Sequence, residues 1–357
     1  MSRIEQAWQN RGLLAVILWP VSVLYRLIVT LRRLTYKFGL AQTHRSRLPV
    51  VVVGNISVGG TGKSPLTAWL VQTLKASGWS PAIVSRGYGG ERHLTPHLVN
   101  TETDTAALVG DEPLMLAKQT AVPVCVCVRR AKAVERIVND THADIIIADD
   151  GLQHLAMQRA YEIVVIDNER GLGNGWMLPA GPLRESRSRL RSVDLIVVNG
   201  WSDNSHASRD QQTAALITVP GMHDQENDYL PSIGGFRLAV DSVVDLASGE
   251  AIKLARFSAE PVHAVAGIGH PERFFITLRN AGIEVMAHPF DDHHKFSTED
   301  IQFDDTKAVL VTSKDAVKLR SLVKLPRRVF EVRVRVVADT ALTDAITVLE
   351  NKLRGLA

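Results

Sequence analysis

The chain has 357 residues, and at roughly 100–200 residues per domain this length allows about two domains. Hydrophobic residues make up 45% and charged residues 22%, values that argue against disorder, collagen-like repeats and a disulfide-rich mini-domain. The formal net charge of +3 is too near balance to indicate a nucleic-acid partner.

An uncharged apolar run occupies residues 13–25 and is followed by Arg26, Arg32, Arg33 and Lys37. A helix that spans a bilayer needs about 20 apolar residues, so the run is short, and Pro20 would kink it. A secretory signal, a buried core helix and a membrane-associated helix compete here. No Ala-x-Ala cleavage site follows the run, which argues against the signal. Trp19 and Tyr25 suit the headgroup boundary, so we expect residues 1–40 to form a membrane-associated helix that spans the membrane or lies in the interface.

A phosphate-binding loop is predicted after the apolar strand at residues 49–53. The loop reads Gly-Asn-Ile-Ser-Val-Gly-Gly-Thr-Gly-Lys-Ser-Pro over residues 54–65 and runs into a helical pattern. This context favours a P-loop over a chance glycine-rich turn. Lys63 would reach the β- and γ-phosphates, and Ser64 would hold Mg²⁺. The expected nucleotide contacts are Ser57, Val58, Gly59, Gly60, Thr61, Gly62, Lys63 and Ser64.

Two carboxylates, Asp149 and Asp150, end a second apolar strand at residues 145–148. An acid at the C-terminal end of a parallel strand beside a P-loop is the Walker B arrangement. One of the two would organise Mg²⁺, directly or through water. A strand-end turn or a helix cap is the alternative, and the P-loop makes that alternative the weaker one.

Two further segments carry candidate chemistry. The strand at residues 81–85 runs into a glycine-rich loop, where Arg86 could meet a phosphate or a substrate anion. Asp111 begins an amphipathic helical pattern, so it is either a helix N-cap or a general base that activates a hydroxyl. Cys125 and Cys127 share one face of a predicted strand, which favours core packing over a metal or redox pair.

The second half of the chain indicates further α/β structure. Residues 171–191 form a loop rich in Gly, Pro and Arg, which is either a solvated basic helix or a surface for lipid headgroups or an anionic substrate. The strand at residues 194–199 should close the first sheet, and residues 200–235 are typical of a connection and hairpin. A second α/β unit follows, with strands at residues 262–266, 284–287 and 308–312.

A polar loop in that second unit contains Asp292, His293 and His294. Adjacent histidines on a strand point in different directions, so joint ligation of one metal is hard. A surface loop and a catalytic or orienting histidine stay open, because His titrates near neutrality and tunes a nearby carboxylate. Thr-Ser-Lys-Asp at residues 312–315 is weakly similar to the base-reading motif of GTPases, and a strand-end turn is the alternative.

The ordered motifs along nearly the whole chain resemble the tetraacyldisaccharide 4′-kinases of lipid A biosynthesis. A P-loop alone is shared by many families, whereas the ordered set is specific. The stretches that carry the resemblance are residues 54–65, 85–89 (Ser-Arg-Gly-Tyr-Gly), 110–113 (Gly-Asp-Glu-Pro), 149–154 (Asp-Asp-Gly-Leu-Gln-His), 178–185 (Leu-Pro-Ala-Gly-Pro-Leu-Arg-Glu), 292–296 (Asp-His-His-Lys-Phe) and 312–318 (Thr-Ser-Lys-Asp-Ala-Val-Lys).

The resemblance implies a lipid kinase at the cytoplasmic face of the bacterial inner membrane. Such an enzyme transfers the γ-phosphate of ATP to the 4′-hydroxyl of a tetraacylated glucosamine disaccharide 1-phosphate, which forms lipid IVA. The implied partners are ATP, Mg²⁺, the acylated disaccharide and the inner-membrane lipid surface, with no nucleic acid.

The resemblance also implies roles for matched residues. Asp111 would be the general base, supported by His293, with His294 as the alternative partner. The other implied catalytic groups are Lys63, Asp149 and Asp150. The implied Mg²⁺ ligands are Ser64, Asp149, Asp150 and Glu185, and the implied substrate contacts are Arg86, Tyr88, Glu112, Gln153 and Arg184.

We therefore expect an α/β fold with a P-loop NTPase-like, mostly parallel sheet flanked by helices, a second smaller α/β domain and the N-terminal membrane-associated helix. The expected boundaries are 1–40 for this helix, 41–215 for the kinase core, 216–255 for the connecting hairpin region and 256–357 for the smaller domain with a C-terminal helix. This division places Asp111 and His293 in different domains, so their meeting would require domain closure.

Two other functions stay open. The loop has Ser57 where the usual motif has glycine, and so it is similar to the variant loops of dimeric partitioning ATPases. It lacks their extra lysine, because Val58 occupies that place. The other alternative is a membrane-bound nucleotide-binding module without catalysis, which would have no use for a base at Asp111.

Overall fold

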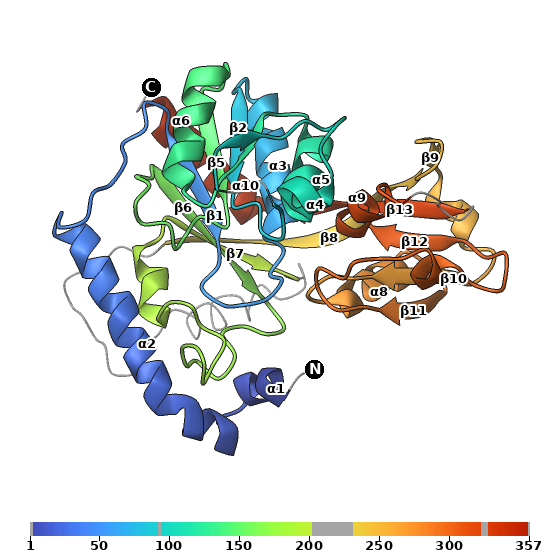
Figure 1. Cartoon of the computed structure of the whole chain (residues 1–357), viewed down its shortest axis with the longest axis horizontal. Helices are drawn as coiled ribbons and strands as arrows, with labels where there is room; N and C mark the ends of the chain where they lie inside the picture. Colours follow the sequence, from blue (N-terminus) through green and yellow to red (C-terminus); the bar gives the residue numbers. More distant parts are fainter. Residues whose placement is uncertain (1–2, 92–93, 202–230, 323–327, 356–357) are drawn as a thin grey trace. The chain divides into compact units, whose positions relative to one another are not determined.

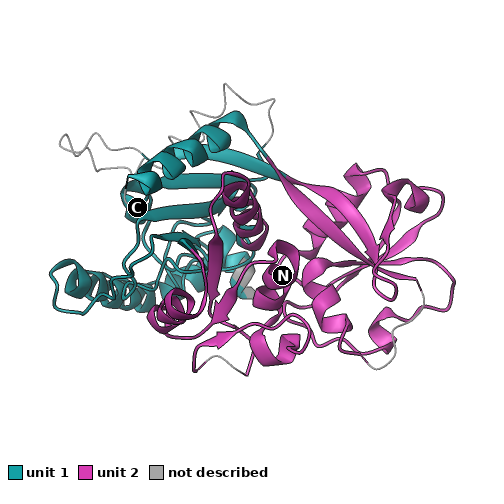
Figure 2. Cartoon of the chain, turned by 90° about the horizontal axis from the view of Figure 1, so that it is seen from above, with its two compact units in different colours: residues 1–63, 144–237, 338–357 teal, residues 64–143, 238–337 magenta. Residues whose placement is uncertain are grey.

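The structure is a computed structural model that describes residues 3–91, 94–201, 231–322 and 328–355 (Figure 1). By their contacts, the residues form two compact units (Figure 2). Unit 1 comprises residues 1–63, 144–237 and 338–357, and unit 2 comprises residues 64–143 and 238–337. Each unit thus combines segments from both halves of the chain. The expected domain boundaries stay a prediction, and part of the expected hairpin region, residues 216–230, lies outside the described residues.

Unit 1 is built on parallel strands in the order β8-β7-β6-β1-β5. In register, Val51 of β1 lies opposite Ile147 on one side and Tyr161 on the other. Every residue of β1, β5, β6 and β7 is buried, which explains why these strands are continuous apolar runs. Their bounds are β1 (Val50–Gly54), β5 (Ile145–Asp149), β6 (Tyr161–Asp167), β7 (Leu195–Asn199) and β8 (Ser232–Asp245).

The expectation that β7 closes the first sheet is wrong, because β7 lies between β6 and β8. The first residues of β8 contain Gly234 and Gly235. Glycine has a low strand propensity, so this strand was not predicted from the sequence. Both glycines serve close packing. A Cβ on Gly234 would lie 2.6 Å from the Cα of Leu342, and one on Gly235 would lie 2.6 Å from Cγ of Trp201.

The helices of unit 1 include a long N-terminal one, α2 (Leu13–Lys37). Pro20 lies inside α2 without ending it, and Ala15 and Ser22 are its buried residues. Within the described part of the chain, α2 is the one helix long and apolar enough to cross a membrane, by length and composition. The other helices of the unit are α1 (Arg3–Gln9), the 3₁₀ helix η1 (Arg187–Ser192) and α10 (Thr340–Arg354).

Unit 2 contains two groups of strands. In the first, β2 (Pro81–Ser85) is parallel to β4 (Val124–Val126), and β3 (His97–Leu98) is antiparallel to β4. Cys125 and Cys127 are buried free thiols, and burial raises the pKa of Cys125 to about 12, so the prediction of core packing is confirmed. The helices of this segment are α3 (Lys63–Ala76), whose first residue belongs to unit 1, α4 (Ala106–Val109), α5 (Asp111–Thr120) and α6 (Arg130–Asp140).

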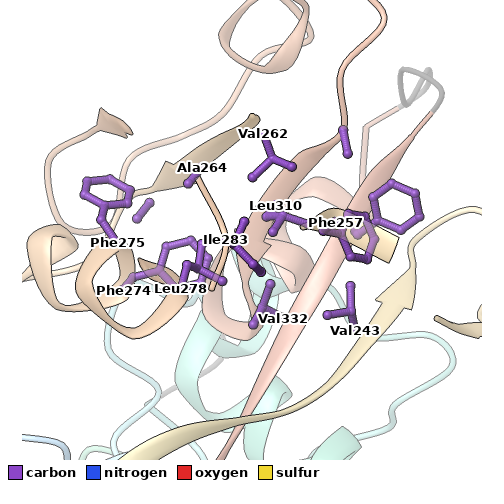
Figure 3. Packing of buried hydrophobic residues seen from close by; sticks show 13 residues of the cluster. Val243, Phe257, Val262, Ala264, Phe274, Phe275, Leu278, Ile283, Leu310 and Val332 are labelled. Carbon is purple, nitrogen blue, oxygen red and sulfur yellow. The ribbon is translucent and has the colours of Figure 1, made fainter. Parts of the chain in front are cut away.

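The second group of strands in unit 2 is parallel in the order β11-β10-β12-β13, and β9 is antiparallel to the end of β8. Side chains of α8 pack on this sheet: Phe274, Phe275 and Leu278 belong to one buried cluster with Val262 and Leu310 (Figure 3). The elements are β9 (Ala251–Ile252), η3 (Leu254–Phe257), β10 (Val262–Ala266), α8 (Pro271–Asn280), β11 (Val285–Pro289), η4 (Glu299–Ile301), β12 (Val309–Thr312), α9 (Ser313–Leu319) and β13 (Val329–Ala338).

The predicted fold class is confirmed: the strands are mostly parallel, helices flank them and an apolar helix begins the chain. The strand expected at residues 262–266 is present with these bounds, and those expected at residues 284–287 and 308–312 are present with shifts of one or two residues. Residues 313–315 were expected to form a turn or a GTPase-like motif, and they begin α9 instead. Thr312 caps this helix, because its side chain accepts a hydrogen bond from the backbone N–H of Asp315.

The contact between β8 and α10 gives a stability prediction. A Cβ added by Gly234→Ala would clash with the Leu342 backbone at 2.6 Å, so the helix must move away from the strand. We expect the variant to lose about 1–3 kcal/mol of unfolding free energy, measured by urea denaturation. The control is Gly355→Ala, whose Cβ would meet its nearest atoms at 3.6 and 3.7 Å. Equal stability of Gly234→Ala and the unmodified chain would contradict the packing argument.

Candidate active site

The predicted phosphate-binding loop follows β1 in unit 1 and ends at Lys63, the first residue of α3. Gly62 has φ +89°, and a Cβ at this position would lie 2.5 Å from Nδ2 of Asn199. Nδ2 of Asn199 donates a hydrogen bond to the backbone carbonyl of Thr61 at 3.1 Å. Glycine is therefore required at position 62, both by its backbone conformation and by the close approach of Asn199.

A buried hydroxyl in this loop fits a phosphate ligand. Thr61 is 2% exposed, and its Oγ1 is buried without a hydrogen-bond partner in the protein. Leaving such a group unpaired is costly, by about 1–3 kcal/mol. The loop also ends at the N-terminus of α3, a helix of 14 residues, where backbone N–H groups and the helix dipole favour an anion. The residues present therefore fit a nucleotide phosphate.

The side chain of Asp150 brings two predicted cationic contacts together in unit 1. Its Oδ1 lies 3.5 Å from Nζ of Lys63, and its Oδ2 lies 3.3 Å from NH1 of Arg184. Asp150 follows β5 with φ +48°, a left-handed conformation that is uncommon outside glycine and recurs at functional sites. Asp149, the last residue of β5, is buried.

Glu185 and Gln153 form a second cluster in unit 1. Nε2 of Gln153 donates to Oε1 of Glu185 at 2.8 Å and to the backbone carbonyl of Asn55 at 3.0 Å. Oε2 of Glu185 lies 3.4 Å from Nε of Arg189 and 3.9 Å from NH1 of Arg33. Gln153 therefore connects the segment after β5 to the beginning of the predicted phosphate loop.

Arg189 corrects one sequence interpretation. It was grouped with arginines expected on a solvated helix or facing lipid or substrate, but it is 4% exposed. It forms ion pairs with Glu162 and Glu185, which compensate the burial of its charge. Burial raises the pKa of Glu162, but the hydrogen bond and charge of Arg189 outweigh burial and leave that pKa below its ordinary value.

The described carboxylates of unit 1 do not by themselves form a complete metal-binding site. Among the described residues, no group of three or more His, Cys, Asp and Glu side chains is placed to hold a metal ion. Magnesium commonly binds through one or two carboxylates together with the phosphates of a nucleotide. Asp149 and Asp150 are oxygen donors of this kind at the end of β5, so the residues fit a magnesium ion that arrives with a nucleotide.

In unit 2, Asp111 and His293 are hydrogen-bonded. Nδ1 of His293 lies 3.0 Å from Oδ2 of Asp111, although the two residues are far apart in the sequence. The backbone N–H of Glu112 donates to Oδ1 of Asp111 at 2.9 Å. Gly110 is the N-cap of α5, so Asp111 is not the cap that the alternative interpretation proposed. Both oxygens of a buried carboxylate are thus engaged.

His293, and not His294, is the partner of Asp111. Nε2 of His294 lies 3.2 Å from Oδ2 of Asp300, and its ring lies beside those of Phe290 and Phe296 at centroid distances of 4.6 and 4.8 Å. His293 has φ +62°, a left-handed backbone conformation that is uncommon outside glycine. The histidines thus have separate carboxylate partners.

The environment favours the ionised form of both members of the pair. Burial raises the pKa of Asp111, but the hydrogen bond with His293 and the charge of Lys314 outweigh it, so this pKa lies below its ordinary value. The hydrogen bond with Asp111 raises the pKa of His293 above its ordinary value, against the effect of burial. Each member of the pair therefore favours the charged form of the other.

The other predicted substrate residues of unit 2 lie around this pair or on its neighbouring loop. The Tyr88 ring lies 5.1 Å from the His293 ring, and Tyr88 is 62% exposed. Oε1 of Glu112 accepts a hydrogen bond from Lys314 at 3.2 Å. Arg86 is exposed directly after β2.

Sequence reasoning missed Asn199 and Lys314. Asn199 ends the apolar strand β7, and a polar residue at the carboxyl end of a parallel strand is the same signal that marked Asp149. Lys314 lies inside one of the motifs that carry the family resemblance, but it was assigned no role there.

The parallel sheet, the glycine loop before α3 and the acidic strand end define an α/β protein of the P-loop NTPase class. The family model for LpxK, Tetraacyldisaccharide-1-P 4′-kinase, matches residues 14–352. The tetraacyldisaccharide 4′-kinase of Methylobacillus flagellatus is 41% identical over 319 residues, which cover 88% of this chain and 86% of the relative. That of Actinobacillus succinogenes is 42% identical over 313 residues, which cover 87% of each chain.

A solved structure agrees with this assignment at the level of the fold. The crystal structure of the "apo" form of LpxK from Aquifex aeolicus in complex with ATP has a TM-score of 0.74 and 24% sequence identity, and the match covers 95% of this chain and 99% of that one. The chain therefore belongs to the tetraacyldisaccharide 4′-kinase family, and it is a kinase. The family resemblance of the sequence motifs is confirmed.

The Asp111–His293 pair predicts a pH-dependent contribution to stability. Because folding lowers the pKa of Asp111, this group stabilises the fold at pH values above the pKa that it has in the unfolded chain. Because folding raises the pKa of His293, this group stabilises the fold at pH values below the pKa that it has in the unfolded chain. Both contributions are complete between about pH 4 and about pH 6.5. We expect His293→Gln to lower the unfolding free energy by about 1 kcal/mol in this window and by less at pH 8.5, as His293 loses its proton.

The measurement is urea denaturation of both proteins at pH 5.5 and pH 8.5. Replacement of the exposed His142 by Gln serves as the control, and it should change the unfolding free energy little because the side chain is exposed. A destabilisation by His293→Gln that is equal at both pH values would show that the pair is not ionised.

Proposed function

We propose that the protein transfers the γ-phosphate of ATP to the 4′-hydroxyl of a tetraacylated glucosamine disaccharide 1-phosphate and so forms lipid IVA. The observation that carries the proposal is the buried Asp111 carboxylate, hydrogen-bonded to His293 at 3.0 Å in a chain of the tetraacyldisaccharide 4′-kinase family. The Aquifex aeolicus relative was solved in complex with ATP, which supports ATP as the phosphate donor.

Phosphoryl transfer depends mainly on positioning and on neutralisation of phosphate charge. In the proposed mechanism, residues 57–64 hold the nucleotide phosphates through backbone N–H groups, and Lys63 exchanges its contact with Asp150 for the β- and γ-phosphates. The Thr61 hydroxyl gains a phosphate acceptor there. The proposed ligands of Mg²⁺, which supplies further charge neutralisation when bound, are Ser64, Asp149, Asp150 and Glu185.

The acceptor hydroxyl needs a base as it attacks. Oδ2 of Asp111 takes the proton of the 4′-hydroxyl, while His293 holds the carboxylate in position and balances its charge. A bond forms between the hydroxyl oxygen and the γ-phosphorus, the bond from that phosphorus to the bridging oxygen breaks, and ADP leaves. The proposed substrate contacts are Arg86, Tyr88, Glu112, Gln153 and Arg184.

We also propose that α2 lies in the interface of the inner membrane, at the cytoplasmic face, where an acylated substrate is held. Oγ of Ser22 donates to the carbonyl of Met177 and accepts from the N–H of Ala180, both at 2.9 Å, and the Tyr25 hydroxyl donates to the carbonyl of Arg184 at 3.2 Å. These contacts hold one side of the helix against unit 1. The exposed apolar side chains of α2 are Leu13, Leu14, Val16, Ile17, Trp19, Val21, Val23, Leu24, Leu27, Ile28, Leu31 and Leu34.

Asp111→Asn tests the proposed base. We expect the variant to lower kcat by about 10²–10⁴-fold, because an amide cannot accept the hydroxyl proton. The KM for ATP should change little. The assay incubates the enzyme with radiolabelled ATP and the lipid disaccharide and separates the products by chromatography.

Asp104→Asn is the matched control, because the Asp104 side chain is only 5% exposed and is also paired with a histidine, His97, at 2.7 Å within the same unit. It should leave the rate unchanged. Normal phosphorylation of the disaccharide by Asp111→Asn would overturn the proposed mechanism. ATP hydrolysis without any disaccharide product would favour the partitioning-type ATPase instead.

The double variant Leu27→Glu, Ile28→Glu tests the membrane surface. Both side chains are exposed, by 53% and 56%, so the change adds charge without disturbing a core. Because burial of apolar side chains drives interfacial binding, we expect flotation with phosphatidylglycerol vesicles to fall by about tenfold or more. Val348→Glu, at a 58% exposed apolar position on α10, is the control and should float as before. Unchanged flotation of the double variant would refute this role of α2.

A further inference from the structure

The ammonium group of Lys314 is surrounded by three carboxylates in unit 2. Its Nζ lies 3.0 Å from Asp292, 3.2 Å from Glu112 and 3.9 Å from Asp111. The Lys314 side chain is 12% exposed, so little solvent screens these interactions. Lys314 is the second residue of α9, whereas its three partners come from the start of α5 and from the loop after β11.

Three carboxylates at such distances from one point repel one another and favour protonation. The Lys314 ammonium group among them offsets this repulsion. Burial lowers the pKa of Lys314, but the charges of Glu112, Asp111 and Asp292 outweigh burial and leave it above its ordinary value. Lys314 therefore stays charged at neutral pH.

Lys314 also fixes the loop that carries His293. Oδ1 of Asp292 accepts a hydrogen bond from Nζ of Lys314 and another from the backbone N–H of His293, both at 3.0 Å. His293 is held with φ +62°, a conformation that needs support from its surroundings. A closed set of contacts thus runs from Lys314 through Asp292 and His293 to Asp111 and back to Lys314.

A second lysine faces Asp111 from the next turn of α9. Nζ of Lys318 lies 3.7 Å from Asp111, but it lies closer, at 2.8 Å, to the fully buried Asp315. It also donates to the carbonyl of Gly267 at 3.3 Å and lies 5.4 Å from the centre of the Phe296 ring. Lys318 is therefore bound mainly to its own structural partners, which leaves Lys314 as the cation that bridges the groups around the proposed base.

We propose that Lys314 is a positioning residue for phosphoryl transfer, which holds Asp111, Glu112 and Asp292 together and keeps the Asp111–His293 pair charged and aimed. The inference rests on the proposed function of Asp111. The charged groups that face Asp111 are Glu112 on α5, Lys314 and Lys318 on α9, and Asp292 and His293 on the loop after β11. Tyr88 contacts the His293 ring.

Lys314→Met tests the electrostatic part. Because removal of a nearby cation disfavours the carboxylate, we expect the acidic limb of the kcat–pH profile to move upward by about one pH unit or more. We expect kcat at pH 7 to fall by about tenfold or more, with the KM for ATP within about twofold of its normal value. Lys314→Arg, which keeps the charge, should return the acidic limb to its original position.

The matched control is Lys307→Met. Lys307 is another ion-paired lysine of unit 2, at 2.6 Å from Asp305, and it is not a partner of Asp111, Glu112 or Asp292. Its replacement should leave both the rate and the profile unchanged. A Lys314→Met enzyme with an unmoved acidic limb and normal kcat would overturn the proposal.

A titration of His293 separates this inference from the proposed function. Histidine ring signals followed by NMR, with His293 assigned through His293→Gln, should show a higher pKa of His293 in Lys314→Met, because one nearby cation is lost. This result does not depend on which group is the base. If Asp111→Asn kept full activity while the His293 pKa still moved, the proposed base would fail and the electrostatic role of Lys314 would stand. An unmoved His293 pKa would refute that role.

Asp292→Asn tests whether Lys314 positions His293 through the loop after β11. This variant also tests the proposal if Lys314→Met does not fold. It keeps the ammonium beside Asp111 but weakens the hold of Lys314 on the loop. We expect kcat to fall by about tenfold, with an acidic limb that does not move upward. Full kcat in Asp292→Asn would show that Lys314 does not position His293 through this loop.

Discussion

The ionised Asp111 carboxylate is the constraint on which the proposed site depends. A buried charge is unfavourable unless opposite charges and hydrogen bonds compensate it. Here the N–H of Glu112 and Nδ1 of His293 take the two oxygens, and Lys314 supplies a cation at 3.9 Å. The folding of unit 2 around this carboxylate and the proposed reaction need the same arrangement, since a base must be both charged and fixed in position.

Unit 1 follows the same physical rule with different residues. Glu162 and Glu185 are buried, and Arg189 compensates both. Asp150, by contrast, is partly accessible and contacts Lys63 and Arg184 at 3.5 and 3.3 Å, which are loose distances for ion pairs. The buried Glu162–Arg189 pair is thus suited to structure, while the contacts of Asp150 are of a kind that a phosphate could replace at little cost.

Much of this arrangement was predictable from the sequence, because buried parallel strands are continuous apolar runs that end in functional side chains. That signal located β1 and β5, and with them Lys63, Asp149 and Asp150. It did not locate the first part of β8, since Gly234 and Gly235 are there for close packing and not for strand propensity.

Pairings between distant residues could not be derived from one sequence. Nothing in two adjacent histidines tells which one meets Asp111, and the answer depends on the φ of +62° that the folded loop imposes on His293. The same limit explains why Lys314 was missed, because its three partners come together only in the folded unit.

The exposed helix α2 is a different case. Most of its apolar side chains remain exposed in the folded chain. The hydroxyl groups of Ser22 and Tyr25 donate hydrogen bonds to backbone carbonyls elsewhere in unit 1. Exposure of that size is unfavourable in water, which supports the proposal that α2 lies against a lipid surface.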